Sequence, residues 1–129
     1  MADDNYEELT MLKIEQNITL EELDSWGTVV DLGSELLEGD GKAFGRFTVG
    51  NPELPINGGY FGVTKSIFRM TYPFSEQATI VTGQLTLTNE ETGEKWVLNE
   101  GDSWVVAKGT SLLWEVNSDF FVKHYLSAV

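Results

Sequence analysis

Glu76 and His124 are the side chains of this chain that could most directly handle a proton or a charged ligand. A carboxylate inside an apolar cavity can bind an amine or act as a general base, but it favours its protonated form there unless a cation or hydroxyl pairs with it. Histidine is the commonest proton carrier near neutral pH. Each residue also has a structural interpretation, Glu76 as a solvated residue at a strand start and His124 as a hydrogen-bonding residue beside aromatic rings. The residue types alone leave both interpretations open.

Apolar side chains surround the position of Glu76 in the predicted strand pattern. In the strand expected over residues 65–72, Phe68, Met70 and Tyr72 lie on one face because strand side chains alternate. Glu76 joins this face if the strand continues past the following bend. One carboxylate among apolar and aromatic walls is typical of a small-molecule site. The candidate ligand-binding residues are Glu76, Tyr72, Met70, Phe68, Leu112, Trp114 and His124. The same aromatic residues would equally serve to fill a core.

The residue composition gives little support for a metal site. The chain has no cysteine, and His124 is its single histidine. A catalytic zinc or manganese site needs about three nitrogen, oxygen or sulfur ligands from the protein, whereas the predicted face offers Glu76 and Tyr72. We therefore expect no metal and no cofactor. Glycine-rich phosphate loops, Ser-His-Asp sets and HExxH motifs are also missing, so no catalytic residue is identified.

Short segments with a period of two dominate the chain from about residue 28 onward. Residues 84–88 alternate inward leucines with outward polar residues, and further strands are expected at 96–98 and 111–116. Turns rich in Gly, Asn and Asp separate these segments at intervals of roughly ten residues. This pattern indicates an antiparallel sandwich or barrel.

The N-terminal segment carries the one helix-like signal. Thr19 is followed three residues later by Glu22, which is a capping-box pattern and predicts a short helix ending at Gly27. The expected organisation is an N-terminal arm with this helix over residues 1–27 and a barrel over residues 28–129. Together they make a single domain, as the length of 129 residues suggests.

The order and spacing of motifs in residues 59–125 resemble the cupin superfamily. The resemblance lies in the segments YFGVTKSIFRMTYPFSEQATIVTGQLTLT, EGDSWVVAKGTSLLWEV and VKHYL. Within the superfamily they are similar to the small single-domain branch that includes ureidoglycine aminohydrolase and the ethanolamine-utilisation cupin. The resemblance implies an all-β double-stranded β-helix, which is a jelly-roll barrel.

The metal-binding positions of cupins are altered in this chain. Cupins typically bind a metal through two histidines and a glutamate of the first motif and one histidine of the second. Glu76 matches that glutamate, but Met70 and Tyr72 stand at the first-motif histidines and Leu112 at the second-motif histidine. The resemblance therefore implies the fold without its usual metal ligands.

The net charge and the length of the apolar segments limit which partners and which location are expected. The formal net charge is −13, and such a surface repels phosphate backbones, so a nucleic-acid partner is not expected. No apolar run is long enough for a membrane span, and the acidic start is unlike a signal peptide, so a cytoplasmic location is expected. Met11, Leu12 and Ile14 form an isolated apolar set ahead of the barrel. Because cupins commonly pair at sheet edges, this set predicts a homodimer.

Three functions remain open from the sequence. The first is a small-molecule-binding cupin without strong catalytic chemistry. The second is an enzyme of amine or ureide nitrogen metabolism, which the resemblance implies. The third is a structural or interaction protein with a filled barrel. The missing histidines favour the first over the second, and a cavity inside the barrel would distinguish the first from the third.

Overall fold

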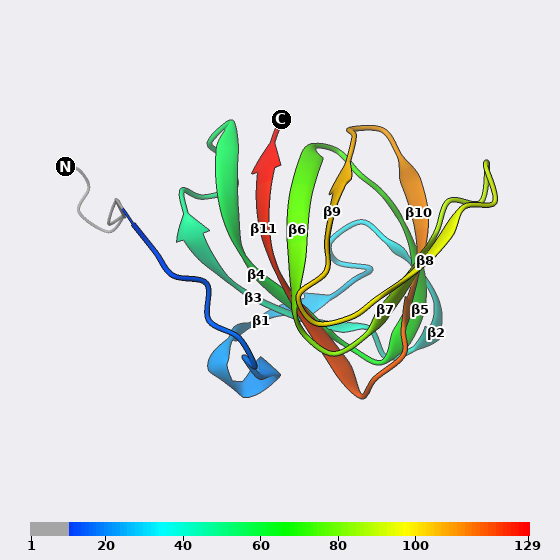
Figure 1. The fold of residues 1–129 in the computed structure, drawn as a ribbon, viewed down its shortest axis with the longest axis horizontal. Helices are drawn as coiled ribbons and strands as arrows, with labels where there is room; N and C mark the ends of the chain where they lie inside the picture. Colours follow the sequence, from blue (N-terminus) through cyan, green and yellow to red (C-terminus); the bar gives the residue numbers. More distant parts are fainter. Residues whose placement is uncertain (1–10) are drawn as a thin grey trace.

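The computed structural model describes residues 11–129, and these residues form an all-β structure of eleven strands (Figure 1). The first element is a 3-10 turn, η1 (Leu20–Glu22). The strands are β1 (Asp24–Thr28), β2 (Glu35–Gly39), β3 (Lys42–Val49), β4 (Ile56–Thr64), β5 (Ser66–Thr71), β6 (Ser75–Thr82), β7 (Leu85–Thr88), β8 (Lys95–Leu98), β9 (Ser103–Val106), β10 (Ser111–Val116) and β11 (Phe120–Ala128). The strands expected at 65–72, 84–88, 96–98 and 111–116 are confirmed as β5, β7, β8 and β10.

The strands form two antiparallel sheets that face each other. The six-stranded sheet has the order β1-β3-β4-β11-β6-β9, and the five-stranded sheet has the order β2-β5-β10-β7-β8. Within residues 11–129, no strand pairing links one sheet to the other. The closed barrel that the sequence predicted is therefore not formed. Side-chain packing, rather than a continuous hydrogen-bond ladder, holds the two sheets together as an open sandwich.

Strand alternation explains which residues enter the core. In β10 every second side chain, namely Leu112, Trp114 and Val116, is buried. The central strand β11 pairs with β4 on one side and β6 on the other, so both of its edges are hydrogen-bonded within the sheet. Its residues Lys123 and Tyr125 face the other sheet, because residues two apart on a strand lie on the same face.

The main core lies between the sheets and is rich in aromatic rings. The rings of Phe68 and Trp114 stack with their centroids 5.1 Å apart. Trp114 of the five-stranded sheet also meets Phe121 of the six-stranded sheet edge-on at 5.7 Å. Such contacts bury large apolar areas and fix how the sheets lie on each other.

A second, smaller core lies on the outer face of the six-stranded sheet, beneath residues 14–23, which we call the strap. The buried residues of this core are Ile18, Leu23, Tyr60, Val81 and Val122. Hydrogen bonds to the sheet fasten the strap: among them, the Glu15 N–H donates to the Tyr60 hydroxyl at 2.9 Å, and the Thr82 hydroxyl donates to the Ile18 carbonyl at 2.7 Å. The strap therefore covers part of the sheet that would otherwise expose apolar side chains.

The short helix predicted near the N-terminus is only the 3-10 turn η1. The expected capping contact is present, because the Thr19 N–H donates to the Glu22 carboxylate at 2.9 Å. The next residue, Leu23, is already extended, and Asp24 pairs with Gly45 in the sheet. A single turn does not propagate when the following residues gain sheet hydrogen bonds, since helix nucleation is costly.

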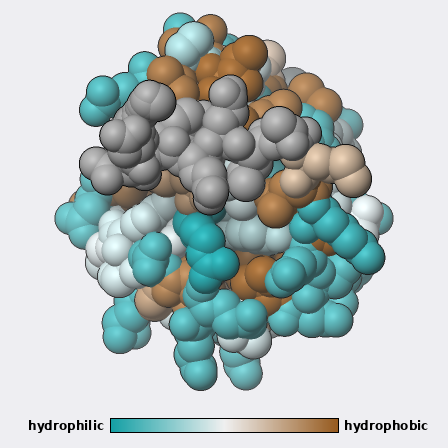
Figure 2. Space-filling model, turned by 90° about the vertical axis from the view of Figure 1, so that its left-hand side faces the viewer, coloured by the Kyte–Doolittle hydropathy of each residue, from teal (hydrophilic) through white to brown (hydrophobic). Residues whose placement is uncertain are grey.

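The surface differs between the two ends of the molecule. Figure 2 shows hydrophobic residues gathering toward the end where the C-terminus lies and hydrophilic residues dominating the opposite end. In the part of the chain that the structure describes, no helix has the length and apolar character needed to cross a membrane.

Candidate functional site

A cavity of about 490 Å³ lies between the two sheets. This volume is within the range of small-molecule pockets. Residues of the β1–β2 loop, such as Leu32 and Ser34, form part of its rim. The six-stranded sheet contributes Trp26, Phe47 and Phe61, and the five-stranded sheet contributes Phe68, Met70 and Trp114.

One ion pair lies in this mainly apolar wall. Among the described residues that line the cavity, only Glu76 and Lys123 have charged side chains. The Lys123 ammonium donates to Glu76 Oε2, and the two side chains are 4% and 2% exposed. Glu76 lies near the start of β6, and Lys123 lies in the middle of the neighbouring strand β11. Because burial of either charge alone is strongly unfavourable, each residue permits the burial of the other.

Aromatic rings enclose the Lys123 ammonium. The distances from Nζ to the ring centroids are 4.8 Å for Trp114, 5.4 Å for Tyr125, 5.5 Å for Phe61, 5.9 Å for Trp104 and 6.0 Å for Tyr72. The electron-rich faces of such rings attract a cation, most strongly where water is excluded. The rings and Glu76 together hold the ammonium inside the sandwich.

Several hydrogen-bond donors near the pair are free. The Tyr72 hydroxyl and the indole N–H groups of Trp104 and Trp114 are buried and have no hydrogen-bond partner within residues 11–129. Burial raises the pKa of Tyr72 well above its usual value, the charge of Glu76 adds to this shift, and the two nearby indole N–H groups oppose it. Burial and then the charge of Glu76 also raise the pKa of Tyr125. Both phenols are therefore neutral donors near pH 7.

The structure brings most of the predicted ligand-binding residues into this interior. Phe68, Met70, Glu76 and Trp114 line the cavity. Tyr72 is fully buried in the same core, but it lies behind the cavity wall. These five residues come together because β5, β6 and β10 present the same alternating face to the space between the sheets.

Leu112 and His124 lie away from the cavity. Leu112, which pairs with Met70 across β10 and β5, lines a second cavity. His124 lies on the outer face of the six-stranded sheet, because it is adjacent to Lys123 in the strand. Its Nε2 is 2.8 Å from the Thr48 hydroxyl, and its ring meets Tyr60 edge-on at 4.9 Å. Burial in this position lowers the pKa of His124.

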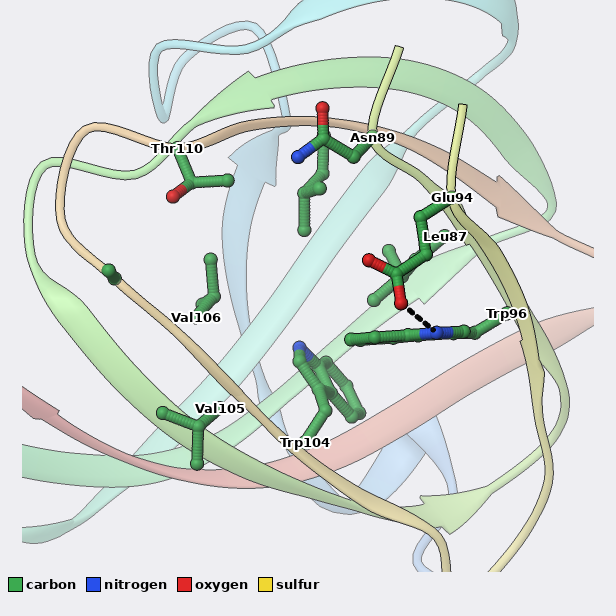
Figure 3. Close-up of a pocket in the computed structure, with 10 residues that line it drawn as sticks. Leu87, Asn89, Glu94, Trp96, Trp104, Val105, Val106 and Thr110 are labelled. Atoms are coloured by element: carbon green, nitrogen blue, oxygen red, sulfur yellow. Dashed lines mark hydrogen bonds between the residues drawn. The ribbon is translucent and has the colours of Figure 1, made fainter. Parts of the chain in front are cut away.

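The second cavity is much smaller, at about 170 Å³, and lies beside β8 and β9 (Figure 3). Trp96 and Trp104 form part of its wall, and the Trp96 indole donates to the Glu94 carboxylate at 3.1 Å. Its volume lies below the usual range of small-molecule pockets. The cavity that contains Glu76 and Lys123 is therefore the candidate site.

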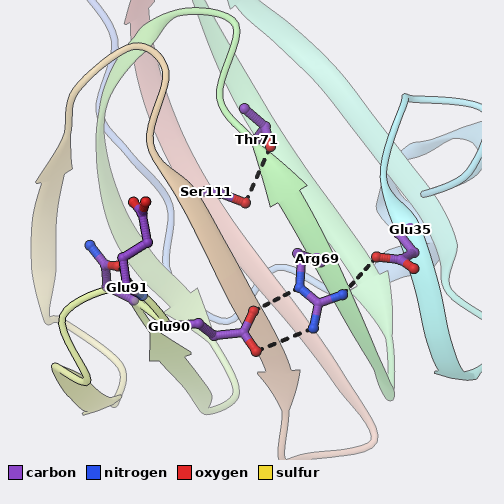
Figure 4. A network of polar contacts seen from close by, with 7 residues as sticks. Glu35, Arg69, Thr71, Glu90, Glu91 and Ser111 are labelled. Carbon is purple, nitrogen blue, oxygen red and sulfur yellow. Dashed lines mark hydrogen bonds and ion pairs between the residues drawn. The ribbon is translucent and has the colours of Figure 1, made fainter.

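Arg69 forms an ion-pair network on the outer face of the five-stranded sheet (Figure 4). Its guanidinium donates to Glu90 at 2.7 and 3.2 Å and to Glu35 at 2.7 Å. The hydrogen bonds to Glu90 and Glu35 raise the pKa of Arg69, and the bond from Arg69 lowers the pKa of Glu90. These groups connect β2 and β5 to the turn between β7 and β8 without reaching the cavity, so we assign them a structural role.

Lys123 is the main site residue that the sequence pattern did not identify. Lysine is rarely buried, so it is not an obvious member of an interior wall. A signal was nevertheless present, because Lys123 lies two residues from both Phe121 and Tyr125 on the same face of one strand. A lysine on the apolar face of a central strand needs an acidic partner.

The cavity residues do not fit a metal ion. Glu76 is the one carboxylate among the described residues of the wall, and its charge is paired with Lys123. In residues 11–129 no group of three or more His, Cys, Asp or Glu side chains is arranged to hold a metal. An ammonium at hydrogen-bond distance from the carboxylate also repels a second cation.

The two facing antiparallel sheets with a ligand-sized space between them define a small cupin domain. Residues 52–125 match the family model described as the EutQ-like cupin domain, and this match covers more than half of the chain. The chain therefore belongs to the EutQ-like cupin domain family. This confirms the resemblance to the cupin superfamily and its ethanolamine-utilisation branch. Among curated proteins, no match to the chain is found.

Solved structures with the same fold include proteins of different kinds. The EutQ protein of Clostridium difficile is 18% identical, with a TM-score of 0.57 over 67% of this chain and 68% of that chain. A protein of unknown function from Vibrio parahaemolyticus is 14% identical, with a TM-score of 0.57 over 83% and 98%. The Cupin_2 domain of an XRE family transcriptional regulator from Enterobacter cloacae is 13% identical, with a TM-score of 0.55 over 67% and 96%. At these identities the likeness establishes the fold alone.

Proposed function

We propose that this chain is a small-molecule-binding cupin whose ligand occupies the cavity between the sheets. The observation that carries the proposal is an aromatic cavity of about 490 Å³ with one buried ion pair, Lys123 and Glu76, in its wall. Apolar walls with a few fixed polar groups are the usual composition of small-molecule sites. Protein interiors are otherwise closely packed, so a filled core would not leave this volume.

The alternative of an enzyme of amine or ureide nitrogen metabolism has less support. The phenols of Tyr72 and Tyr125 keep their protons near neutral pH, as ordinary tyrosines do, and burial raises their pKa values further. His124, the one histidine, lies on the outer face of the sheet and not in the cavity. The carboxylate of Glu76 is already bonded to Lys123. We therefore favour binding over catalysis.

Titration with N-phenyl-1-naphthylamine, an uncharged dye that fluoresces in apolar surroundings, tests the binding function. We expect saturable binding to the wild-type protein. Ser34→Trp places a large ring at the rim of the cavity and should weaken binding at least tenfold. Glu91→Trp, in the exposed turn between β7 and β8, adds the same ring far from the cavity and should leave the affinity unchanged. An absence of saturable binding, or equal affinity in all three proteins, would contradict the proposal.

We also infer that two copies of the chain associate through the outer face of the six-stranded sheet. Cross-strand register aligns a row of uncharged residues on this face: Val49, Gly58, Leu126, Gln77 and Val105. The side chains of Val49, Leu126 and Val105 are 40%, 46% and 71% exposed. An exposed apolar row without charge on a chain of net charge −13 is a surface that a second copy can approach.

The basis of this homodimer differs from the one that the sequence suggested. Ile14 packs against the second core of its own chain, so it is not free to pair with a neighbour. Met11 and Leu12 are exposed and lie ahead of the strap. The row of the sheet crosses five neighbouring strands, so we place the interface there.

A further inference from the structure

We infer that the cavity selects an uncharged molecule that carries a carbonyl-type hydrogen-bond acceptor on an apolar body. This inference rests on the proposed binding function and adds the charge and polarity of the ligand. Three features of the cavity support it: the charge balance of its side chains, its free hydrogen-bond donors, and the aromatic rings in the rest of its wall.

The charged residues of the wall neutralise each other. Glu76 and Lys123 carry its charged side chains within the described residues, and these side chains are bonded to one another. A ligand with an ammonium group would leave one uncompensated positive charge in the cavity, and a carboxylate ligand would leave one negative charge. Uncompensated buried charge is strongly unfavourable, so a neutral ligand is favoured over either ion. The amine that the sequence suggested as a partner for Glu76 is supplied by the chain itself, as Lys123.

Hydrogen-bond donors exceed acceptors around the pair. An ammonium carries three N–H groups, and Lys123 uses one of them within residues 11–129, toward Glu76. The Trp114 indole N–H, in the wall of the cavity, is also without a partner there. A ligand oxygen beside Lys123 would accept a charge-assisted hydrogen bond, which is stronger than a neutral one. Glu76 Oε1 has no partner in the described residues either, so an adjacent ligand N–H also finds an acceptor.

The rest of the wall suits a flat apolar group. Trp26 and Phe47 lie with their ring centroids 5.1 Å apart, and Trp26 lies 6.5 Å from Phe61. All three residues line the cavity. Aromatic rings pack favourably against other planar groups in stacked or tilted arrangements. An aromatic carboxamide therefore satisfies both the polar and the apolar parts of the wall.

Three probes that share one ring system test this selectivity. 2-Naphthamide is neutral, 2-naphthoate is an anion, and 2-(aminomethyl)naphthalene is a cation at pH 7. Isothermal titration of the wild-type protein should show 2-naphthamide binding at least tenfold more tightly than either ion.

Variants of the ion pair should switch the preferred charge. Glu76→Gln leaves Lys123 unpaired and should make 2-naphthoate the tightest of the three probes. Lys123→Met leaves Glu76 unpaired and should favour the cationic probe instead. The double variant Glu76→Gln/Lys123→Met is neutral again, and it should return the preference to 2-naphthamide with weaker binding because the ammonium donor is lost. Lys42→Met removes an exposed charge from β3 and serves as the control, with wild-type selectivity expected.

The outcomes separate the two proposals. The inference is wrong if either ion binds the wild-type protein as tightly as 2-naphthamide, or if the double variant keeps the preference of a single variant. If a single variant does not fold, the ranking of the three probes by the wild-type protein and by the double variant still tests the inference. If the cavity dye N-phenyl-1-naphthylamine binds but the three probes rank equally, the binding function stands and the inference falls. If neither the dye nor any probe binds, both are overturned.

Discussion

Among single residues, Lys123 and Glu76 bear both on the stability of the fold and on the ligand binding that we propose. Both side chains are almost completely buried, and the rings of Trp114 and Tyr125 lie against the ammonium. A buried pair of this kind need not be more stabilising than two apolar residues of the same volume. Its presence in a cavity wall therefore agrees with the ligand-binding role that we propose.

Breaking the pair should cost much more stability than replacing it. Lys123→Met leaves the Glu76 charge buried and unpaired, so we expect a loss of about 3–5 kcal/mol in the free energy of unfolding. The double variant Glu76→Gln/Lys123→Met should recover most of this loss, since it buries no charge. Urea unfolding followed by tryptophan fluorescence at pH 7 measures the free energy of unfolding of the single and the double variant. Additive losses in the double variant would show that the two residues do not act as a pair. Glu76→Gln alone should also destabilise the protein, because it leaves the Lys123 charge buried without its partner.

His124 should make stability decrease in mildly acidic solution. Burial lowers its pKa in the folded state, whereas in the unfolded chain it titrates near its ordinary value of about 6.5. The unfolded state therefore binds the proton more readily. The stabilisation from neutral His124 is complete above that value and is lost as the pH falls through it toward the lower folded pKa. His124→Gln should reduce the change in unfolding free energy between about pH 7.5 and 5.5. An identical pH dependence in both proteins would contradict this explanation.

At the scale of elements, the strap of residues 14–23 stabilises the six-stranded sheet from outside. It carries one short turn, yet it fills the second core and is fastened by the hydroxyls of Tyr60 and Thr82. Extended segments with few internal hydrogen bonds owe their order to such packing. The contribution of the strap should therefore depend on its buried side chains.

Ile18→Ala should destabilise the protein by about 2 kcal/mol or more, as is usual for truncating a buried isoleucine. Ile18 is 4% exposed, whereas Met11, just ahead of the strap, is 92% exposed. Met11→Ala should therefore change stability by no more than about 0.5 kcal/mol. Urea unfolding of both variants compares the two positions. Equal effects would mean that the strap does not contribute to the folded state as described.

At the scale of the whole molecule, charge opposes association while the apolar row favours it. Two chains of net charge −13 repel each other, and salt screens this repulsion over a distance of about 10 Å at 0.1 M ionic strength. The uncharged row on the six-stranded sheet gives the two copies a surface on which they can meet. A stable interface of standard size would bury about 800 Å² on each copy.

Sedimentation at tens of micromolar should detect a dimer, and salt should strengthen it because the repulsion between copies is screened. Leu126→Lys places a charge in the centre of the row and should give the 14.4 kDa monomer. Leu37→Lys, at an exposed position of β2 in the other sheet, should leave the dimer intact. A wild-type protein that remains monomeric at both low and high salt would contradict the proposed interface.

The sequence by itself determined several of the strands, the family and part of the apolar wall of the site. Alternation is a local property, so the strands at 84–88 and 111–116 could be identified from their own residues. The same alternation placed Phe68, Met70 and Tyr72 on one face of a strand. The motif order identified the cupin family without requiring a complete metal site.

Only the tertiary structure decided what Glu76 binds and which residues face the cavity. Glu76 and Lys123 are 47 positions apart, and their contact depends on β11 pairing with β6 in a particular register. The N-terminal segment likewise looked helical until its next residues paired with β3. Strand order and register arise from the packing of the whole chain, and a local pattern contains no information on which distant charge will be buried beside it.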